Sequence, residues 1–178
     1  GDEKNVLRRM YEAANRSKSD IVIRITGDDI LIDPFYLDKL IKFHLENNLE
    51  YSNNKNLPGG TEVEVFNINI LKFLLETIDD LSGTEYLTFF IQRYKDQFIT
   101  GSLNIPKRHQ SKKSLTIDTT TDFLFVQNFL KLMCKKKIKY NYTMDDIINY
   151  LRKNNKKKPI SQKPILINTD LKWEKIII

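Results

Sequence analysis

The sequence has few of the residues that cross-link a small domain or anchor a protein in a membrane. Its 178 residues include one cysteine, Cys134, which excludes an internal disulfide and favours a reducing compartment such as the cytoplasm. No apolar run approaches the ~20 residues needed to cross a bilayer. The first residues are polar and lack the apolar stretch of a signal peptide. These absences disfavour a membrane protein and a disulfide-rich secreted domain.

Histidine is almost as scarce as cysteine. His44 lies among apolar residues of a predicted helix, and His109 lies in a basic loop. Neither has a nucleophile or a metal ligand beside it in the sequence, so a structural or solvated role is favoured for both. Cys134 falls in an apolar helical pattern and is interpreted as a core thiol. No histidine- or cysteine-based site is therefore predicted.

The composition is that of one soluble globular domain. Hydrophobic residues make up 40% of the chain, charged residues 29% and aromatic residues 11%, which is enough apolar material for a core. The net charge is +6, and much of the excess lies at 135–139 and 152–158. We interpret these lysines as a solvated helix end and tail, because nucleic-acid binding has only charge in its favour.

Short β-branched runs alternate with helical periods along the chain. Helices are predicted at 5–16, 33–47, 69–78, 82–94, 119–133 and 143–153, and strands at 21–25, 49–51, 61–66, 98–105 and 115–117. This alternation predicts an α/β fold with a mostly parallel sheet and helices on both faces. The strand at 61–66 has a polar face, which suggests an antiparallel or edge element.

The chain divides into an α/β domain at 1–153 and a basic linker with a strand-like tail at 154–178. The tail contains two apolar, strand-like runs at 165–167 and 173–178. We expect these runs to pair with a sheet edge or with another subunit, because a domain closed by a helix offers them no partner. A homo-oligomer, most simply a homodimer in which the tail or the 61–66 strand takes part, is the resulting prediction.

Two predicted strands end in aspartates. Asp28 follows the strand at 21–25, and Asp118 follows the strand at 115–117. Carboxyl ends of parallel strands face the usual ligand crevice, and two carboxylates there match what Mg²⁺ takes from a protein. A structural role in ending strands is the competing interpretation. Asp29 and Asp122 are interpreted as structural, Asp122 because it completes a helix cap.

Five sequence motifs occur in an order that resembles one family. They are Gly-Asp-Glu-Lys-Asn-Val-Leu-Arg-Arg at 1–9, Arg-Ile-Thr-Gly-Asp at 24–28 with Leu-Ile-Asp-Pro at 31–34, Pro-Gly-Gly-Thr-Glu-Val-Glu-Val-Phe at 58–66, Glu-Tyr-Leu-Thr at 85–88 and Leu-Thr-Ile-Asp-Thr-Thr-Thr-Asp at 115–122. The region 1–153 thereby resembles the cytidylyltransferases of the spore-coat-polysaccharide and acylneuraminate type. These enzymes couple CTP to an acidic sugar and release pyrophosphate.

The resemblance implies a Rossmann-like, glycosyltransferase-A-like sheet and a role in making CMP-sugars for polysaccharide biosynthesis. It implies that Asp28 and Asp118 bind Mg²⁺ and serve catalysis, with CTP and an acidic or modified sugar as partners. The substrate-binding residues that it implies are Arg24, Gly60, Glu62, Glu64 and Glu85.

The chain also departs from the family pattern. Thr84 and Tyr86 replace an arginine and a histidine, and Asp29-Ile30 replaces a Cys-Pro pair. The family's opening strand and Gly/Arg/Lys nucleotide loop would precede Gly1, so we expect an N-terminally truncated relative. These 178 residues alone are then expected to lack turnover. The alternative is a non-catalytic sugar-binding or assembly module derived from the family.

Overall fold

A computed structural model of the chain describes residues 5–79, 81, 87–138, 141–154, 164–169 and 172–177. Its main sheet has four strands, in the order β1-β3-β2-β4. The strands are β1 (Ile21–Arg24), β2 (Tyr51–Asn53), β3 (Glu64–Asn67) and β4 (Thr100–Ser102).

Three of the four strands run in the same direction. Strand β2 pairs in parallel with β4, and β3 pairs antiparallel with both β1 and β2. The mostly parallel α/β sheet is therefore confirmed, and so is the antiparallel element predicted at 61–66, although the strand spans Glu64–Asn67. That element is not an edge strand, however, because β3 has a neighbour on each side. Self-association through an open edge of this strand is therefore excluded, and self-association as such stays a prediction.

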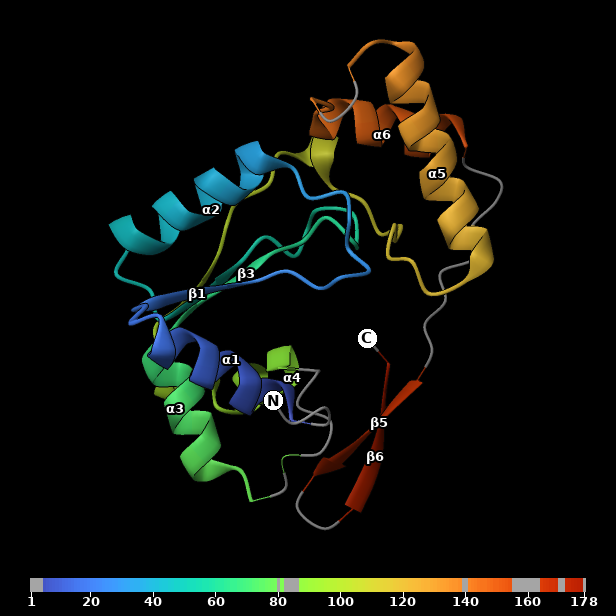
Figure 1. Cartoon of the computed structure of the whole chain (residues 1–178). Helices are drawn as coiled ribbons and strands as arrows, with labels where there is room; N and C mark the ends of the chain where they lie inside the picture. Colours follow the sequence, from blue (N-terminus) through green and yellow to red (C-terminus); the bar gives the residue numbers. More distant parts are fainter. Residues whose placement is uncertain are drawn as a thin grey trace.

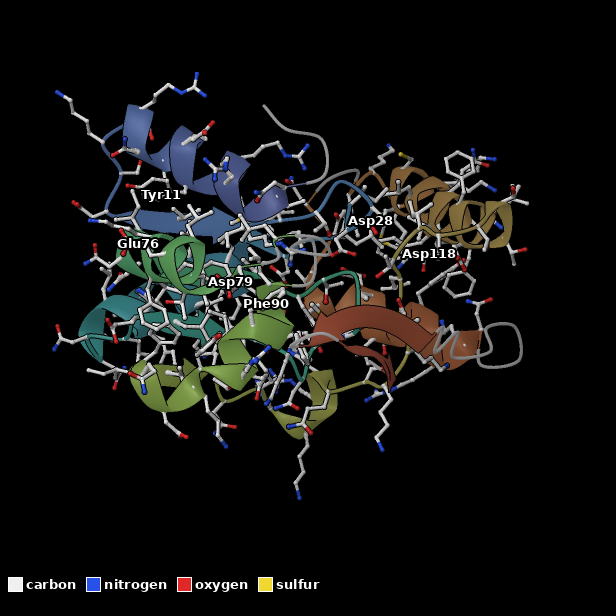
Figure 2. All side chains as sticks on the ribbon, turned by 90° about the horizontal axis from the view of Figure 1, so that it is seen from below. Tyr11, Asp28, Glu76, Asp79, Phe90 and Asp118 are labelled. Atoms are coloured by element: carbon white, nitrogen blue, oxygen red, sulfur yellow. The ribbon has the colours of Figure 1, made fainter. Side chains whose placement is uncertain are left out.

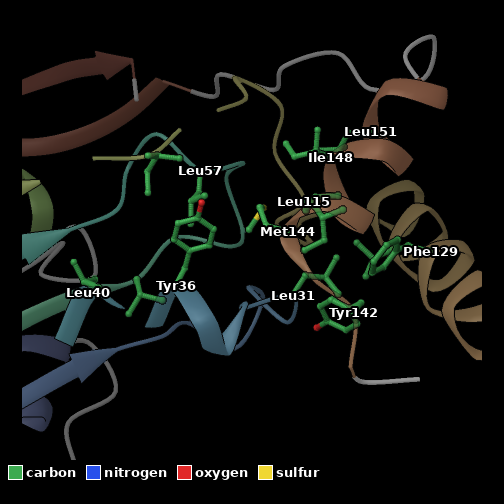
Figure 3. Close-up of a cluster of buried hydrophobic side chains, with 14 of the residues drawn as sticks. Leu31, Tyr36, Leu40, Leu57, Leu115, Phe129, Tyr142, Met144, Ile148 and Leu151 are labelled. Atoms are coloured by element: carbon green, nitrogen blue, oxygen red, sulfur yellow. The ribbon is translucent and has the colours of Figure 1, made fainter. Parts of the chain in front are cut away.

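Helices cover both faces of the sheet (Figure 1). On one face, α1 (Val6–Arg16), α3 (Ile68–Thr77) and α4 (Leu87–Arg93) pack around a core that includes Phe66 of β3. On the other face lies α2 (Pro34–Glu46), and the core there continues to α5 (Thr120–Lys135) and α6 (Met144–Lys153). Figure 3 shows this second core, in which Tyr36 and Leu40 of α2 lie on one side and Phe129 of α5 on the other. The described residues also form two short 3₁₀ helices, η2 (Lys95–Gln97) and η3 (Lys107–His109).

Helix starts follow the local rules that the sequence suggested. Asp33 caps α2 by accepting from the backbone N–H of Phe35 at 2.9 Å. Its other carboxylate oxygen accepts from the N–H of Met144 at 2.9 Å, so one buried side chain ties the starts of α2 and α6 together. The capping boxes predicted for α5 and α6 are both present. The cap predicted at 82–85 lies outside the described residues.

Two local predictions fail. Residues 115–117 form no ladder strand, although Gly59 and Ser114 make an isolated parallel bridge and the N–H of Leu115 donates to the carbonyl of Gly59 at 2.6 Å. Cys134 is exposed, so its interpretation as a core thiol is wrong.

The tail forms two strands, β5 (Pro164–Thr169) and β6 (Lys172–Ile177), which pair antiparallel with each other. The expected pairing with a sheet edge is therefore not what the described residues adopt, and pairing with another subunit stays a prediction. Among the described residues, no helix combines the length and the apolar character needed to span a membrane.

Candidate functional site

A small polar pocket lies where β1 and β2 end and the antiparallel β3 begins. It encloses about 160 Å³. Arg24, Glu62 and Glu64, three of the predicted substrate-binding residues, line it together with Asp29, Tyr51 and Thr88. The position agrees with the rule that ligands of α/β sheets bind beyond the carboxyl ends of the parallel strands.

Glu64 is the most tightly held side chain of this pocket. The sheet register places it opposite Arg24 of β1, and the Arg24 guanidinium donates to Glu64 Oε2 at 2.7 Å. The hydroxyl groups of Tyr51 and Thr88 each donate to Glu64 Oε1 at 2.6 Å. Burial and the neighbouring Glu64 charge raise the pKa of Tyr51, so its hydroxyl stays a donor. Glu64 therefore joins β1, β2 and α4.

Tyr51 and Thr88 were not predicted as site residues. They lie 13 and 24 residues from Glu64 in sequence. Thr88 ends the motif at 85–88, but nothing in that motif indicates a carboxylate partner, and Tyr51 belongs to no motif. Only the pairing of β2 with β3 and the packing of α4 bring the two hydroxyl groups to Glu64. These two residues could have been found from the sequence only if the register between β2 and β3 had been known.

Glu62 lines the same pocket, but its carboxyl group differs from that of Glu64 in its contacts and its pKa. No hydrogen bond or ion pair joins its carboxyl group to any residue that the structure describes. Burial, and then the negative charges of Asp29 and Glu64, raise the pKa of Glu62 to about 8, and the charge of Lys55 only partly opposes them. The carboxyl group of Glu62 can therefore still accept hydrogen bonds from a ligand, whereas that of Glu64 is already occupied.

The two predicted metal-binding aspartates belong to neighbouring segments. The backbone N–H of Ile117 donates to the carbonyl of Asp28 at 3.1 Å, which brings Asp118 within one residue of that contact. Figure 2 labels both residues on the same side of the molecule. Asp28 is half-buried and Asp118 is exposed, so both are open to solvent.

Asp29 connects this aspartate region to the pocket. Its carboxylate accepts from the hydroxyl of Thr26 at 2.6 Å and from the hydroxyl of Thr116 at 3.0 Å. Burial raises the pKa of Asp29 despite these two bonds. The structural role predicted for Asp29 is consistent with these contacts, but the residue also lines the pocket. Asp122 caps α5, as predicted.

Gly60 does not line the pocket, but it makes room for a segment that lies beside the pocket. Its φ of +80° lies in the left-handed region, and a Cβ there would fall 2.5 Å from the backbone nitrogen of Thr116. The missing side chain lets the 115–117 segment approach, and this segment leads into Asp118. Glu85, the last predicted substrate-binding residue, lies outside the described residues.

The two histidines are held by structural contacts. His44 is buried and bonds to Ser52 and Asn67 at 3.0 and 3.2 Å. His109 is buried between the Tyr36 hydroxyl at 2.6 Å and the Asp145 carboxylate at 2.8 Å. These contacts agree with the structural role expected for both.

The sequence model of the cytidylyltransferase family matches residues 1–166. The chain belongs to the cytidylyltransferase family.

Two curated proteins resemble this cytidylyltransferase-family chain in sequence. The uncharacterized protein MJ1063 of Methanocaldococcus jannaschii is 32% identical over 158 residues, which are 86% of this chain and 62% of that protein. The spore coat polysaccharide biosynthesis protein SpsF of Bacillus subtilis is 31% identical over 126 residues, which are 69% of this chain and 52% of that protein. The chain therefore spans between half and two thirds of the length of these relatives.

A solved structure supports the fold assignment. The cytidylyltransferase from Leptospira borgpetersenii superposes with a TM-score of 0.78, at 24% identity, over 87% of this chain and 65% of that one. At this identity the likeness concerns the fold alone, and it agrees with the α/β architecture that the sequence predicted.

Proposed function

We propose that this protein is a Mg²⁺-dependent cytidylyltransferase that forms a CMP-sugar from CTP and an acidic or modified sugar. In this reaction a sugar oxygen attacks the α-phosphorus of CTP, the bond from that phosphorus to the bridging oxygen of the β-phosphate breaks, and pyrophosphate leaves. The hydroxyl proton of the sugar passes to solvent or to a nearby base. Family membership supports the reaction class, and one structural observation supports its location.

That observation is the contact between the aspartate region and the pocket. Thr116 and Ile117 bond to Asp29 and Asp28 at 3.0 and 3.1 Å, so the segment that ends in Asp118 is tied to the wall of a polar pocket. A sugar in the pocket would then lie beside a metal-bound triphosphate. Orientation of two reactants in this way lowers the barrier to their reaction.

Asp28 and Asp118 have the donor chemistry that Mg²⁺ requires. The described residues contain no group of three or more histidine, cysteine, aspartate or glutamate side chains placed to hold an ion. Mg²⁺ commonly takes only one or two carboxylates from the protein, and phosphate and water oxygens complete its coordination. The two solvent-open aspartates fit this requirement. When bound, the ion would neutralise the charge that develops as pyrophosphate leaves.

The side chains of the pocket divide the remaining tasks. Glu64 is saturated by Arg24, Tyr51 and Thr88, so we assign it to holding the pocket wall. Glu62 keeps open acceptor capacity, so we assign it to the hydroxyl or other donor groups of the sugar. Asp29 fixes the turn that carries Asp28.

The proposal is tested by following pyrophosphate release by the full-length protein with CTP, Mg²⁺ and a panel of acidic, neutral and amino sugars. We expect release to require all three components and to fall by at least about 100-fold in the Asp118→Asn variant, since losing a charge-stabilising group costs on this order. Asp38→Asn, at an exposed position of α2, is the matched control and should leave the rate unchanged.

Two other results would count against the proposal. Release that survives Asp118→Asn at the wild-type rate would show that the metal lies elsewhere. Sugar binding at the pocket without release under any condition would support instead a non-catalytic sugar-binding module derived from the family.

A further inference from the structure

A second pocket adjoins the first, between the strand pair β2–β4 and the helices α4 and η2. It encloses about 230 Å³. The two pockets share several lining residues, and η2 and β4 contribute further residues to the second pocket alone. The shared residues are Tyr51, Asn53, Lys55 and Gln92, and the second pocket adds, among others, Lys95 and Ser102. A ligand that fills the first pocket therefore has polar space beside it into which a substituent can extend.

The two pockets differ in charge. Among the acids of the first pocket, Glu62 is mostly protonated at neutral pH, because burial and the charges of its neighbours raise the pKa of its carboxyl group to about 8. Two carboxylates and two basic side chains remain there, so the charges of that pocket balance. Of the residues that the structure describes, Lys55 and Lys95 line the second pocket and no aspartate or glutamate does. The second pocket therefore offers a ligand two positive charges.

The two lysines of the second pocket are available to a ligand. No ion pair joins the ammonium group of Lys55 or Lys95 to an acid in the part of the chain that the structure describes. Both residues are exposed. The backbone N–H of Lys55 and the hydroxyl of Ser102 donate to Oδ1 of the buried Asn53 at 3.3 and 3.0 Å. Asn53 therefore fixes the backbone from which Lys55 projects relative to β4.

The second pocket lies away from the predicted metal site. Asp29, which follows Asp28 and accepts from the hydroxyl of Thr116 at 3.0 Å, lines the first pocket but not the second. The first pocket therefore connects the aspartate region to the second pocket. A triphosphate bound to the metal would lie at the aspartate end. The anionic group nearest to the two lysines would then belong to the sugar.

We propose that the second pocket binds the carboxylate of the acidic sugar, and that Lys55 and Lys95 select an acidic sugar over a neutral one. This inference rests on the proposed function for the nature of the substrate, and it adds where the charged group of that substrate binds. An ammonium group attracts a carboxylate as a point charge, and two in one pocket reinforce each other. Gln92, which lines both pockets, has amide N–H groups that can donate to the same carboxylate.

The test measures the binding of sugars without nucleotide. Glucuronate and glucose share one ring and differ in the carboxylate, and each is titrated at neutral pH into the ¹⁵N-labelled protein while amide shifts are followed. We expect glucuronate to shift the amides at 53–55, 92–95 and 100–102. Its dissociation constant should be roughly 10-fold below that of glucose, the size of effect that a favourable charge contact gives. The advantage should shrink in about 1 M NaCl, because salt screens exposed charges.

Variants that remove or keep charge assign the preference to the two lysines. In the double variant Lys55→Gln/Lys95→Gln, glucuronate and glucose should bind within about 2-fold of each other, since both ammonium charges are gone. The double variant Lys55→Arg/Lys95→Arg keeps the charges and should keep the preference for glucuronate. Lys131→Gln is the matched control, because Lys131 is exposed on α5 and donates to Gln127 of the same helix. It should bind both sugars as wild type does. The same spectra report whether each variant is folded.

Competition distinguishes the carboxylate of a sugar from the phosphates of CTP, since lysines bind both kinds of anion. CTP with Mg²⁺ is added to the protein that is saturated with glucuronate. The glucuronate shifts at 92–102 should stay unchanged. Displacement of glucuronate from these residues would show that the lysines bind the triphosphate, and it would overturn the inference.

Three further outcomes would contradict the inference. These are glucuronate binding that is equal to or weaker than that of glucose, glucuronate shifts that lie outside both pockets, and a glucuronate preference that persists in Lys55→Gln/Lys95→Gln. Pyrophosphate release measures the proposed function separately. Loss of the preference for glucuronate would leave release with other sugars standing, and failed release would leave a positive binding result standing.

Discussion

Two acidic regions lie side by side in this molecule and differ in how far their carboxylates are satisfied. At Glu64, one guanidinium and two hydroxyl groups occupy the carboxylate, and the side chain is 12% exposed. At Asp28 and Asp118, the described contacts involve the backbone, and the residues are half-buried and exposed, respectively. The difference indicates separate tasks, because a saturated buried carboxylate holds elements together and an open one remains available to a ligand.

The strongest test of this contrast removes the saturated carboxylate. Glu64→Ala should lower the free energy of unfolding by about 3 kcal/mol, because it takes the partner from a largely buried guanidinium. Urea unfolding measures the loss. Asp28→Ala is the control from the open region and should stay within about 0.5 kcal/mol of wild type. Equal losses of unfolding free energy in the two variants would contradict the difference between the saturated and the open carboxylates.

A glycine pair tests how the open region is positioned. Gly60→Ala should cost about 2 kcal/mol, because it places a side chain at a positive φ and against the backbone of Thr116. Gly27→Ala should change little, since a Cβ there meets nothing within 4 Å. Urea unfolding compares the two variants, and an equal cost would show that the approach of the 115–117 segment does not depend on Gly60.

A pH series separates Glu62 from Glu64. The folded-state pKa of Glu62, about 8, lies above its ordinary value of 4.5, so the folded protein binds the extra proton between these values. Stability from Glu62 is therefore complete below about pH 4.5 and is lost as the pH rises through about 8. Wild type should lose stability over this range relative to Glu62→Gln, measured by urea unfolding at each pH. Parallel curves for the two proteins would contradict the assignment.

The smallest effect on folding is expected at Asp118. Asp118→Asn removes the charge of an exposed side chain, so its free energy of unfolding should match wild type within about 0.5 kcal/mol. Its affinity for Mg²⁺ should nevertheless fall, which calorimetric titration measures. A large loss of stability would place Asp118 among the structural carboxylates.

Local rules predicted much of this fold. The cap at Asp33 and the boxes at Thr119 and Thr143 depend on side chains within three residues of a helix start, so sequence alone reveals them. The alternation of polar and apolar residues at 61–66 also indicated that this strand is antiparallel or lies at an edge. The extended run at 115–117 failed as a strand because strand formation needs a partner, and its partner is a single bridge at Gly59.

The site was only partly predictable for the same reason. Arg24, Glu62 and Glu64 were found through motif resemblance, whereas Tyr51 and Thr88 reach Glu64 only through the strand register and the packing of α4. The sequence also did not show which carboxyl groups are already hydrogen-bonded and which are open to a ligand. Glu62 and Glu64 are two residues apart and of one type, and only the folded surroundings make one open and the other saturated.

The division between open and saturated carboxylates is tested most directly with Mn²⁺, which shares the preference of Mg²⁺ for oxygen ligands in octahedral geometry. Substoichiometric Mn²⁺ added to the ¹⁵N-labelled protein broadens the amide signals nearest to the ion. The account predicts the strongest broadening at 27–29 and 117–119, and its loss in Asp118→Asn. Strongest broadening around Glu64, or a pattern unchanged by Asp118→Asn, would contradict it.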